Sequence, residues 1–273
     1  MLQANRWRPC LFGTMIAVET AGLREPLKKS IETAAALQAD AIEIDARAEV
    51  RPDEWTQTAR RQFRKYLADA RLCVAAVHFH TRRGYDVAED LQRRVEATQK
   101  AMRLAAELGA PVLVNRVGVV PEDTQSRPWT TLVEVLTDLG RTGQKLGVRL
   151  AAQTGSESGP RLAALLAAIP PGGLAVALDP GALLLGGYSV DEALTALAPD
   201  LAHVYATDAT RDLGGRGVDA TLGTGGVDYP SLLATLAEYD YQGAISVGCR
   251  GASDPREVLG SGVKKLRQWL SRG

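Results

Sequence analysis

The sequence AMRLAAELGAPVLVNRV, residues 101–117, contains the pattern from which the fold can be predicted. Its first half has the apolar spacing of an amphipathic helix, and Gly109 follows as a residue that readily takes the left-handed conformation found after helices. A short apolar run comes next, as expected for a strand that is buried on both faces. This stretch therefore predicts a helix that ends at Leu108 and a strand over residues 111–117.

The same alternation extends along the whole chain. Apolar runs predict strands at residues 11–17, 41–45, 72–80, 111–117, 148–154, 174–179, 201–207 and 244–249. Amphipathic stretches predict helices at about residues 23–37, 52–70, 87–108, 129–146, 160–168, 190–197, 229–239 and 255–270. Gly147 and Gly243, like Gly109, stand just before apolar runs, and we expect each to end a helix.

Eight strand–helix units indicate one α/β domain that spans residues 1–273. Strands that alternate with helices pair in parallel, because a parallel connection needs a crossover. Eight such units in a chain of this length predict a single (β/α)₈ barrel, or TIM barrel. A doubly wound open sheet is the alternative, but it usually has fewer units and no GxGxxG opens the first helix.

Composition limits the classes of partner. Lys+Arg and Asp+Glu both total 32, so the formal charge is zero and nothing favours a nucleic-acid partner. The three cysteines, Cys10, Cys73 and Cys249, are widely spaced and form no CxxC, which argues against a disulfide framework or a zinc knuckle. No run is long enough to span a membrane. We therefore expect a cytoplasmic protein, and the long helices would permit a homodimer.

Alternation along the strands predicts which side chains face the barrel interior. Ile42 and Ile44 suit the helix layer, so Glu43 and Asp45 are expected to point inward. The same reasoning predicts a polar ring at the carboxyl ends of the strands, where barrel active sites are built. Its members are Glu43, Asp45, His78, His80, Asn115 or Arg116, Gln153, Asp179, Tyr205 and Arg250, with His203 also inward. Because burying so many polar groups without a ligand or water is costly, we expect a ligand-binding mouth.

Several segments resemble a known family over most of the chain. They are ALQADAIEIDAR (36–47), FHTRRGYD (79–86), AMRLAAELGAPVLV (101–114), LDPGALLLGG (178–187) and LGTGGVDYPSLLATLAEYDYQGAISV (222–247). They resemble the sugar phosphate isomerase/epimerase group of the xylose isomerase-like TIM barrel superfamily. The resemblance implies a barrel that moves a proton next to the carbonyl of a sugar or sugar phosphate, assisted by a divalent metal such as Mn²⁺ or Mg²⁺.

The resemblance also assigns the metal ligands, a Glu, an Asp, a His and a Glu on the fifth to eighth strands. In this sequence the four positions hold Gln153, Asp179, Tyr205 and Gly248. Only Asp179 keeps the usual ligand type, and Gly248 offers no side chain. We therefore expect the standard site to be largely lost, with at most weak Mn²⁺ or Mg²⁺ binding through Asp179.

Two functions follow as alternatives. The first is an isomerase or epimerase whose proton transfer has moved to Glu43, His78, His80 or Asp208. In this version the two histidines, beside Glu43 and Asp45, could also form a relocated metal site.

The second is a non-catalytic relative, such as a pseudoenzyme, sensor or subunit, that binds a sugar, polyol or sugar phosphate. The residues expected to bind substrate, in either version, are Arg83, Arg116, Gln153, His203, Tyr205, Arg211 and Arg250. The arginines would clamp a phosphate or carboxylate. An abasic-site endonuclease, which shares the fold, is set aside because three histidines are too few for its metals and the charge gives no DNA footprint.

Overall fold

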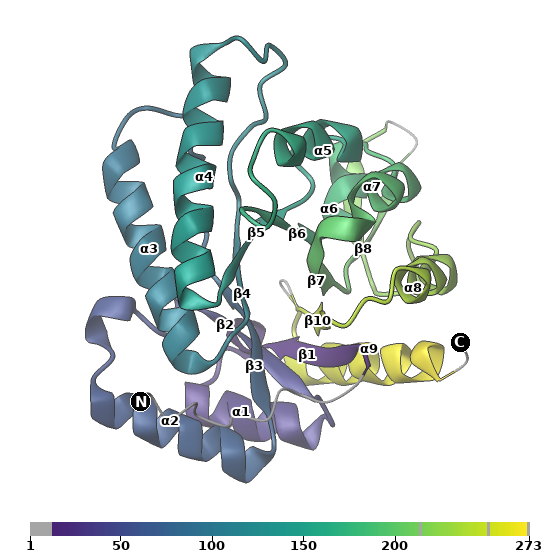
Figure 1. Cartoon of the computed structure of the whole chain (residues 1–273). Helices are drawn as coiled ribbons and strands as arrows, with labels where there is room; N and C mark the ends of the chain where they lie inside the picture. Colours follow the sequence, from purple (N-terminus) through teal and green to yellow (C-terminus); the bar gives the residue numbers. More distant parts are fainter. Residues whose placement is uncertain (1–12, 213–214, 250–251, 272–273) are drawn as a thin grey trace.

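Eight parallel strands close into a barrel in the order β1-β10-β7-β6-β5-β4-β3-β2, with helices around them (Figure 1). The structure is a computed structural model that describes residues 13–212, 215–249 and 252–271. The barrel strands are β1 (Met15–Glu19), β2 (Ala41–Asp45), β3 (Cys73–His78), β4 (Val112–Asn115), β5 (Arg149–Gln153), β6 (Ala175–Leu178), β7 (Leu201–Tyr205) and β10 (Ala244–Val247). The predicted (β/α)₈ barrel is confirmed.

The helices follow the predicted stretches with shifted ends. They are α1 (Leu27–Ala36), α2 (Gln57–Ala70), α3 (Leu91–Leu108), α4 (Arg127–Leu146), α5 (Gly159–Ala167), α6 (Pro180–Gly186), α7 (Val190–Leu197), α8 (Tyr229–Glu238) and α9 (Pro255–Leu270). Short 3₁₀ turns occur at η1 (Thr20–Leu23), η2 (Pro52–Glu54) and η3 (Ala198–Asp200). The first two helices start later than predicted, because Pro26 and Pro52 stand at turns.

Two of the three predicted helix-ending glycines are confirmed. Gly109 and Gly147 follow α3 and α4 with φ of 76° and 70°. The prediction for Gly243 is wrong, because α8 ends at Glu238 and Asp240 takes the positive φ instead. A Cβ at Gly243 would collide with the ring of Tyr241, so this glycine is needed for a close approach.

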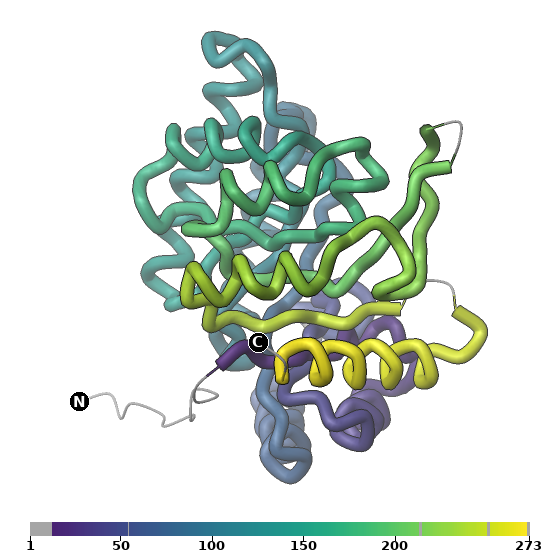
Figure 2. The backbone as a smooth tube through the Cα atoms, turned by 90° about the vertical axis from the view of Figure 1, so that its right-hand side faces the viewer, coloured from purple at the N-terminus to yellow at the C-terminus, as the bar shows by residue number. Residues whose placement is uncertain are grey.

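A two-stranded antiparallel hairpin after β7 was not predicted. It consists of β8 (Asp208–Arg211) and β9 (Gly217–Ala220). In Figure 2 this hairpin stands at the right-hand edge, on the side where β10 leads into α9. The hairpin extends the rim of the barrel at the carboxyl ends of the strands. Helix α6 is a second element that was not predicted.

The core is mainly aliphatic and leaves a narrow barrel interior. Leu132, Leu136 and Leu139 of α4 are fully buried and face the sheet at helical spacing. Burial of each such side chain contributes roughly 1.5–3 kcal/mol. The strands fill the barrel interior largely with small residues, including Ala17, Ala41, Ala76, Ala151, Ala177 and Ala244. No described helix is long and apolar enough to cross a membrane.

Candidate functional site

A cavity of about 260 Å³ opens at the carboxyl ends of the barrel strands. It is lined by Glu19, Ala21, Glu43, Asp45, His78, His80, Arg116, Gln153 and Tyr205. Seven residues of the predicted polar ring therefore meet in one place. They lie on β2, β3, β5 and β7 and just after β3 and β4. The alternation of inward and outward residues was sufficient to find them.

The floor of this cavity is a buried network around Glu43. Tyr205 donates its hydroxyl to Oε1 of Glu43 at 2.8 Å, and Nε2 of His203 lies 2.9 Å from Oε2. Burial opposes ionisation of this carboxyl, but the charge and hydrogen bond of His203, with the charge of His78, outweigh it and lower the pKa of Glu43. Glu43 is therefore a carboxylate that fixes Tyr205 and His203 from across the barrel.

One wall of the cavity is a chain of three side chains. Nδ1 of His78 lies 3.4 Å from Oδ2 of Asp45, and Nε2 of His78 lies 2.8 Å from Nε2 of His80. Oδ1 of Asp45 also accepts the backbone N–H groups of Arg47 and Ala48 at 2.7 and 2.9 Å. Although burial opposes it, the hydrogen bonds of His78 and these amides lower the pKa of Asp45 to about 2. Asp45 is thus an anion that orients His78.

His80 is held neutral at the end of this chain. Burial, the charge of His78 and the charge of Arg116 lower the pKa of His80 to about 3. When Nδ1–H of His78 faces Asp45, its Nε2 accepts the Nε2–H of His80, which leaves Nδ1 of His80 as an acceptor nitrogen. A carboxylate that orients one histidine, which in turn orients a second, is an arrangement that can take up and pass on a proton.

Arg116 supplies the positive charge of the cavity. It follows β4 directly, is exposed, and is the one arginine or lysine among the residues that line this cavity in the described part of the chain. Its guanidinium can stabilise negative charge that develops on a carbonyl oxygen. The cavity therefore combines a neutral imidazole, a carboxylate relay and a cation.

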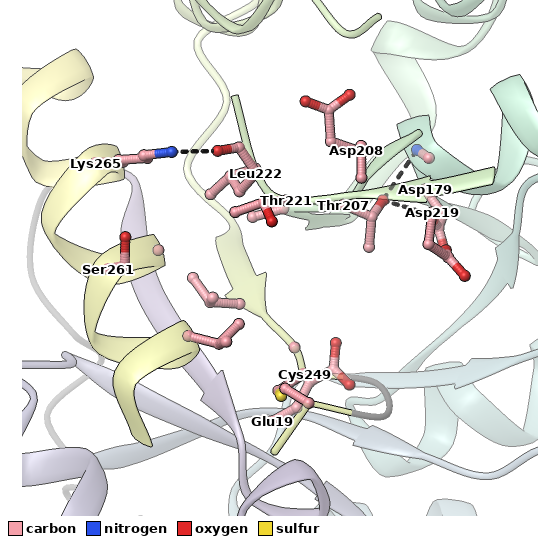
Figure 3. Close-up of a pocket in the computed structure, with 18 of the residues that line it drawn as sticks. Glu19, Asp179, Thr207, Asp208, Asp219, Thr221, Leu222, Cys249, Ser261 and Lys265 are labelled. Atoms are coloured by element: carbon pink, nitrogen blue, oxygen red, sulfur yellow. Dashed lines mark hydrogen bonds between the residues drawn. The ribbon is translucent and has the colours of Figure 1, made fainter. Parts of the chain in front are cut away.

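Glu19 belongs to the site but was not predicted. It ends β1 and lines both this cavity and a neighbouring cavity of about 520 Å³ (Figure 3). The first apolar run was placed at residues 11–17, so Glu19 fell outside the expected strand. The inward position of Ala17, two residues earlier, is the signal that could have found it.

The larger cavity lies between α9, the β8–β9 hairpin and the ends of β6, β7 and β10. Asp208 lies on its lining, and both of its carboxylate oxygens accept backbone N–H groups. Oδ1 accepts from Ala209 and Val227, and Oδ2 accepts from Gly223 and Gly225, at 2.8–3.1 Å. We therefore assign Asp208 to positioning of the glycine-rich loop.

The four positions that the resemblance assigns to a metal do not form a suitable ligand set. Asp179 caps α6, accepting N–H of Ala182 at 2.9 Å and the hydroxyl of Thr207 at 2.5 Å on Oδ1 (Figure 3). Nε2 of Gln153 donates to its Oδ2 at 2.7 Å. Tyr205 donates to Glu43, and Gly248 has no donor atom in a side chain. One carboxylate, an amide and a phenol do not suit a hard divalent cation.

The relocated two-histidine site also lacks the necessary geometry, because Asp45 contacts Nδ1 of His78, on the other side of the ring from the paired Nε2 atoms of His78 and His80. Within residues 13–212, 215–249 and 252–271, no group of three or more His, Cys, Asp or Glu side chains could hold a metal ion.

Two other arginines predicted for the site, Arg83 and Arg211, do not line the cavity of His80. Arg83 forms an ion pair with Glu89 in the loop between β3 and α3. Arg211 donates to the carbonyl of Gly215 at 2.7 Å within the hairpin. Arg250 lies outside the described residues.

Comparison with known proteins assigns the chain to a family. The family model described as a xylose isomerase-like TIM barrel matches residues 31–269, so the chain belongs to this family. A xylose isomerase domain protein from Planctomyces limnophilus is 24% identical, with a TM-score of 0.84 over 95% of this chain and 98% of that chain. No curated protein matches the sequence.

More distant structures share the fold. A D-allulose 3-epimerase from Methylomonas sp., in complex with D-allulose, is 16% identical with a TM-score of 0.74 over 93% of this chain and 96% of that chain. A probable 3-DHS dehydratase from Bacillus anthracis is 12% identical with a TM-score of 0.72 over 93% of this chain and 99% of that chain. At these identities the likeness establishes the fold alone.

Proposed function

We propose that this protein is a sugar or sugar-phosphate isomerase or epimerase in which His80 moves the proton next to the carbonyl. Membership of the xylose isomerase-like family and the likeness to a sugar epimerase support the substrate class. The observation that carries the proposal is the chain from Asp45 through His78 to His80, which ends beside Arg116 in a polar cavity.

The chemistry needs a base, a path for its proton and a cation. Nδ1 of His80 takes the proton from the carbon next to the carbonyl, and the Nε2 proton of His80 passes to Nε2 of His78. The cation formed on His78 faces the carboxylate of Asp45. Arg116 stabilises the enolate oxygen. Return of the proton from His80 to the neighbouring carbon, with the hydroxyl proton of that carbon passing to the enolate oxygen, gives an isomer. Return to the opposite face of the same carbon gives an epimer, and it requires the enolate to turn that face toward His80.

Two neighbouring groups suit the hydroxyls of a sugar. Gln153 lies within hydrogen-bonding reach of His80, and its buried carbonyl oxygen Oε1, which has two lone pairs, can also accept a hydroxyl proton. Tyr205 gives its proton to Glu43, so its oxygen can also accept. Glu43 thus acts as a positioning residue in this proposal.

Deuterium exchange tests the proposal directly. Purified protein treated with EDTA is incubated in D₂O with a panel of ketoses and ketose phosphates, and proton NMR follows the loss of signal next to the carbonyl. We expect exchange that survives EDTA and falls by about 10²–10⁴ in His80→Asn. Exchange that appears only after Mn²⁺ or Mg²⁺ is added, or that His80→Asn leaves unchanged, would contradict the proposal.

The non-catalytic alternative rests on a different observation. Gln153 and Gly248 stand where the resemblance places carboxylates, so the inherited proton-transfer groups are absent from those positions. The same cavity would then bind a sugar, polyol or sugar phosphate without turnover. A ligand-induced rise in Tm for a ketose that shows no exchange would favour this alternative.

A further inference from the structure

A separate cavity of about 520 Å³ lies beside the wall that holds His80. Arginines predominate in its lining, which includes Arg47, Arg82, Arg83, Arg93 and Arg94. Only two carboxylates, those of Glu89 and Asp90, line it within the described part of the chain. The cavity is thus strongly positive in a chain whose formal charge is zero. Such an excess of guanidinium groups in a hollow suits an anion with several oxygens.

Two of these arginines are held in place by the protein. Arg47 donates to the carbonyl of His80 at 2.7 Å, and its guanidinium lies 5.4 Å from the ring centre of Phe79. Arg94 donates to the carbonyls of Val87 and Glu89. Such fixed donors need little reordering when an anion binds.

Donor capacity remains unused in the same cavity. Nε of Arg94 is buried and has no hydrogen-bond partner in the described structure. Arg82 and Arg93 are exposed, and neither has an ion pair or side-chain hydrogen bond to any residue that the structure describes. An anion would satisfy these groups together.

The arginine cavity and the cavity of His80 share a wall. His80 lines one and the next residue, Thr81, lines the other. Similarly, Asp45 lines the cavity of His80 and Arg47 lines the arginine cavity. Arg47 also donates a hydrogen bond to the backbone carbonyl of His80. The two cavities therefore lie next to each other, on either side of the strand ends that carry Asp45 and His80.

We propose that the arginine cavity binds the phosphate group of a phosphorylated sugar whose carbonyl end reaches His80. This names the substrate class of the proposed function and rests on it. A sugar phosphate carries its phosphate several carbon atoms from its carbonyl, which matches two adjacent cavities that recognise different groups. The phosphate would be bound by guanidinium groups and the carbonyl by Arg116.

Binding of inorganic phosphate tests the anion site independently of turnover. Calorimetry at constant ionic strength would compare wild type with the double variant R82Q/R93Q. The control R61Q/R103Q removes the same charge from exposed positions on α2 and α3, with Arg103 about 15 Å farther along α3 than Arg93. We expect phosphate to bind at least about tenfold more weakly to R82Q/R93Q and equally to wild type and control. Equal binding by R82Q/R93Q, or none by wild type, would overturn the site.

Exchange in D₂O tests the substrate class. Wild type and control should exchange a ketose phosphate faster than its parent ketose, and R82Q/R93Q should lose that preference. Equal rates for both ketoses in wild type would overturn the assignment of a phosphorylated substrate. Arginine-dependent phosphate binding with no exchange of any ketose would support the anion site and contradict the isomerase proposal instead.

Discussion

The carboxylate of Glu19 occupies the space into which a side chain at position 248 would extend. A Cβ built on Gly248 would lie 2.7 Å from Oε2 of Glu19 and closer still to Oε1. The two residues are near because β1 pairs with β10, with Val18 opposite Val247. Position 248 is where the resemblance places a carboxylate, so a glycine after β10 admits a carboxylate from β1 to the same part of the barrel mouth.

Substitution of Gly248 tests this relationship. Gly248→Ala should displace Glu19 and destabilise the protein by about 1–3 kcal/mol, because the new methyl group overlaps the carboxylate. The double variant E19A/G248A should recover most of that loss, since the groups that collide are then both small. Urea unfolding of the single and double variants measures the coupling.

Gly226→Ala is the matched control for this pair. The nearest atoms to a Cβ at Gly226 lie at 3.4 Å, an ordinary contact distance, and the residue has no positive φ. It should therefore change stability much less than Gly248→Ala. If the loss of stability in E19A/G248A equals the sum of the losses in E19A and G248A, overlap with Glu19 is not the cause of the loss in G248A.

The neutral state of His80 predicts a dependence of stability on pH. Burial and the charges of His78 and Arg116 lower its pKa from 6.5 to about 3. Below pH 6.5 the unfolded chain takes up a proton that the folded chain refuses, so stability falls as the pH drops from about 6.5 toward 3. His80→Asn should remove the contribution of His80 to this pH dependence of the free energy of unfolding. Urea midpoints at several pH values in this window, for both proteins, measure the difference, and parallel curves would contradict a neutral, buried His80.

Glu49 should affect the pH dependence of stability in the direction opposite to His80, by stabilising the protein at low pH. Burial, with the charges of Asp45 and Glu43, raises its pKa from 4.5 to about 7. Its Oε2 lies 2.9 Å from Oγ1 of Thr20, which also lies 2.9 Å from the carbonyl of Glu43. Oε2 also accepts the backbone N–H of Asp45 at 2.9 Å, and Oε1 is buried with no hydrogen-bond partner among the described residues, so the proton is expected on Oε1.

The substitution Glu49→Gln isolates this effect. The folded state keeps a proton that the unfolded state releases at its ordinary pKa, so the stability that Glu49 contributes is complete below pH 4.5 and is lost as the pH rises toward 7. Glutamine in place of Glu49 keeps a neutral side chain at every pH. The stability of E49Q relative to wild type should therefore increase between pH 4.5 and 7 in thermal or urea unfolding. A constant difference would show that Glu49 is ionised in the folded state.

Much of the barrel could be predicted because its strands are buried on both faces. Alternation in β2 correctly placed Glu43 inside, and contacts with His203 and Tyr205 across the barrel confirm the positions of all three. The β8–β9 hairpin was missed because its strands, DATR and GVDA, are only four residues long and carry no apolar run. Its presence depends on contacts with the rest of the barrel, which the local pattern does not encode.

The relations between side chains could not be predicted in the same way. The pattern placed His78 and His80 at the mouth, but the direct contact of their Nε2 atoms depends on ring orientation. Similarly, the sequence placed Asp208 near the mouth, but it did not show that Asp208 accepts the backbone N–H groups of Gly223 and Gly225 in the loop after β9.

Substitution of Asp208 distinguishes loop positioning from proton transfer. Asp208→Asn replaces one acceptor oxygen with an NH₂ group that faces backbone N–H groups, so it should destabilise the protein by about 1–3 kcal/mol. Loss of order in the loop should also increase proteolytic cleavage there. The exposed Asp219→Asn on β9 is the control and should change neither property. In D₂O exchange, D208N should keep a pH profile parallel to that of wild type, because the base remains His80. A D208N protein of unchanged stability and unchanged proteolysis whose exchange is lost would instead assign Asp208 to the chemistry.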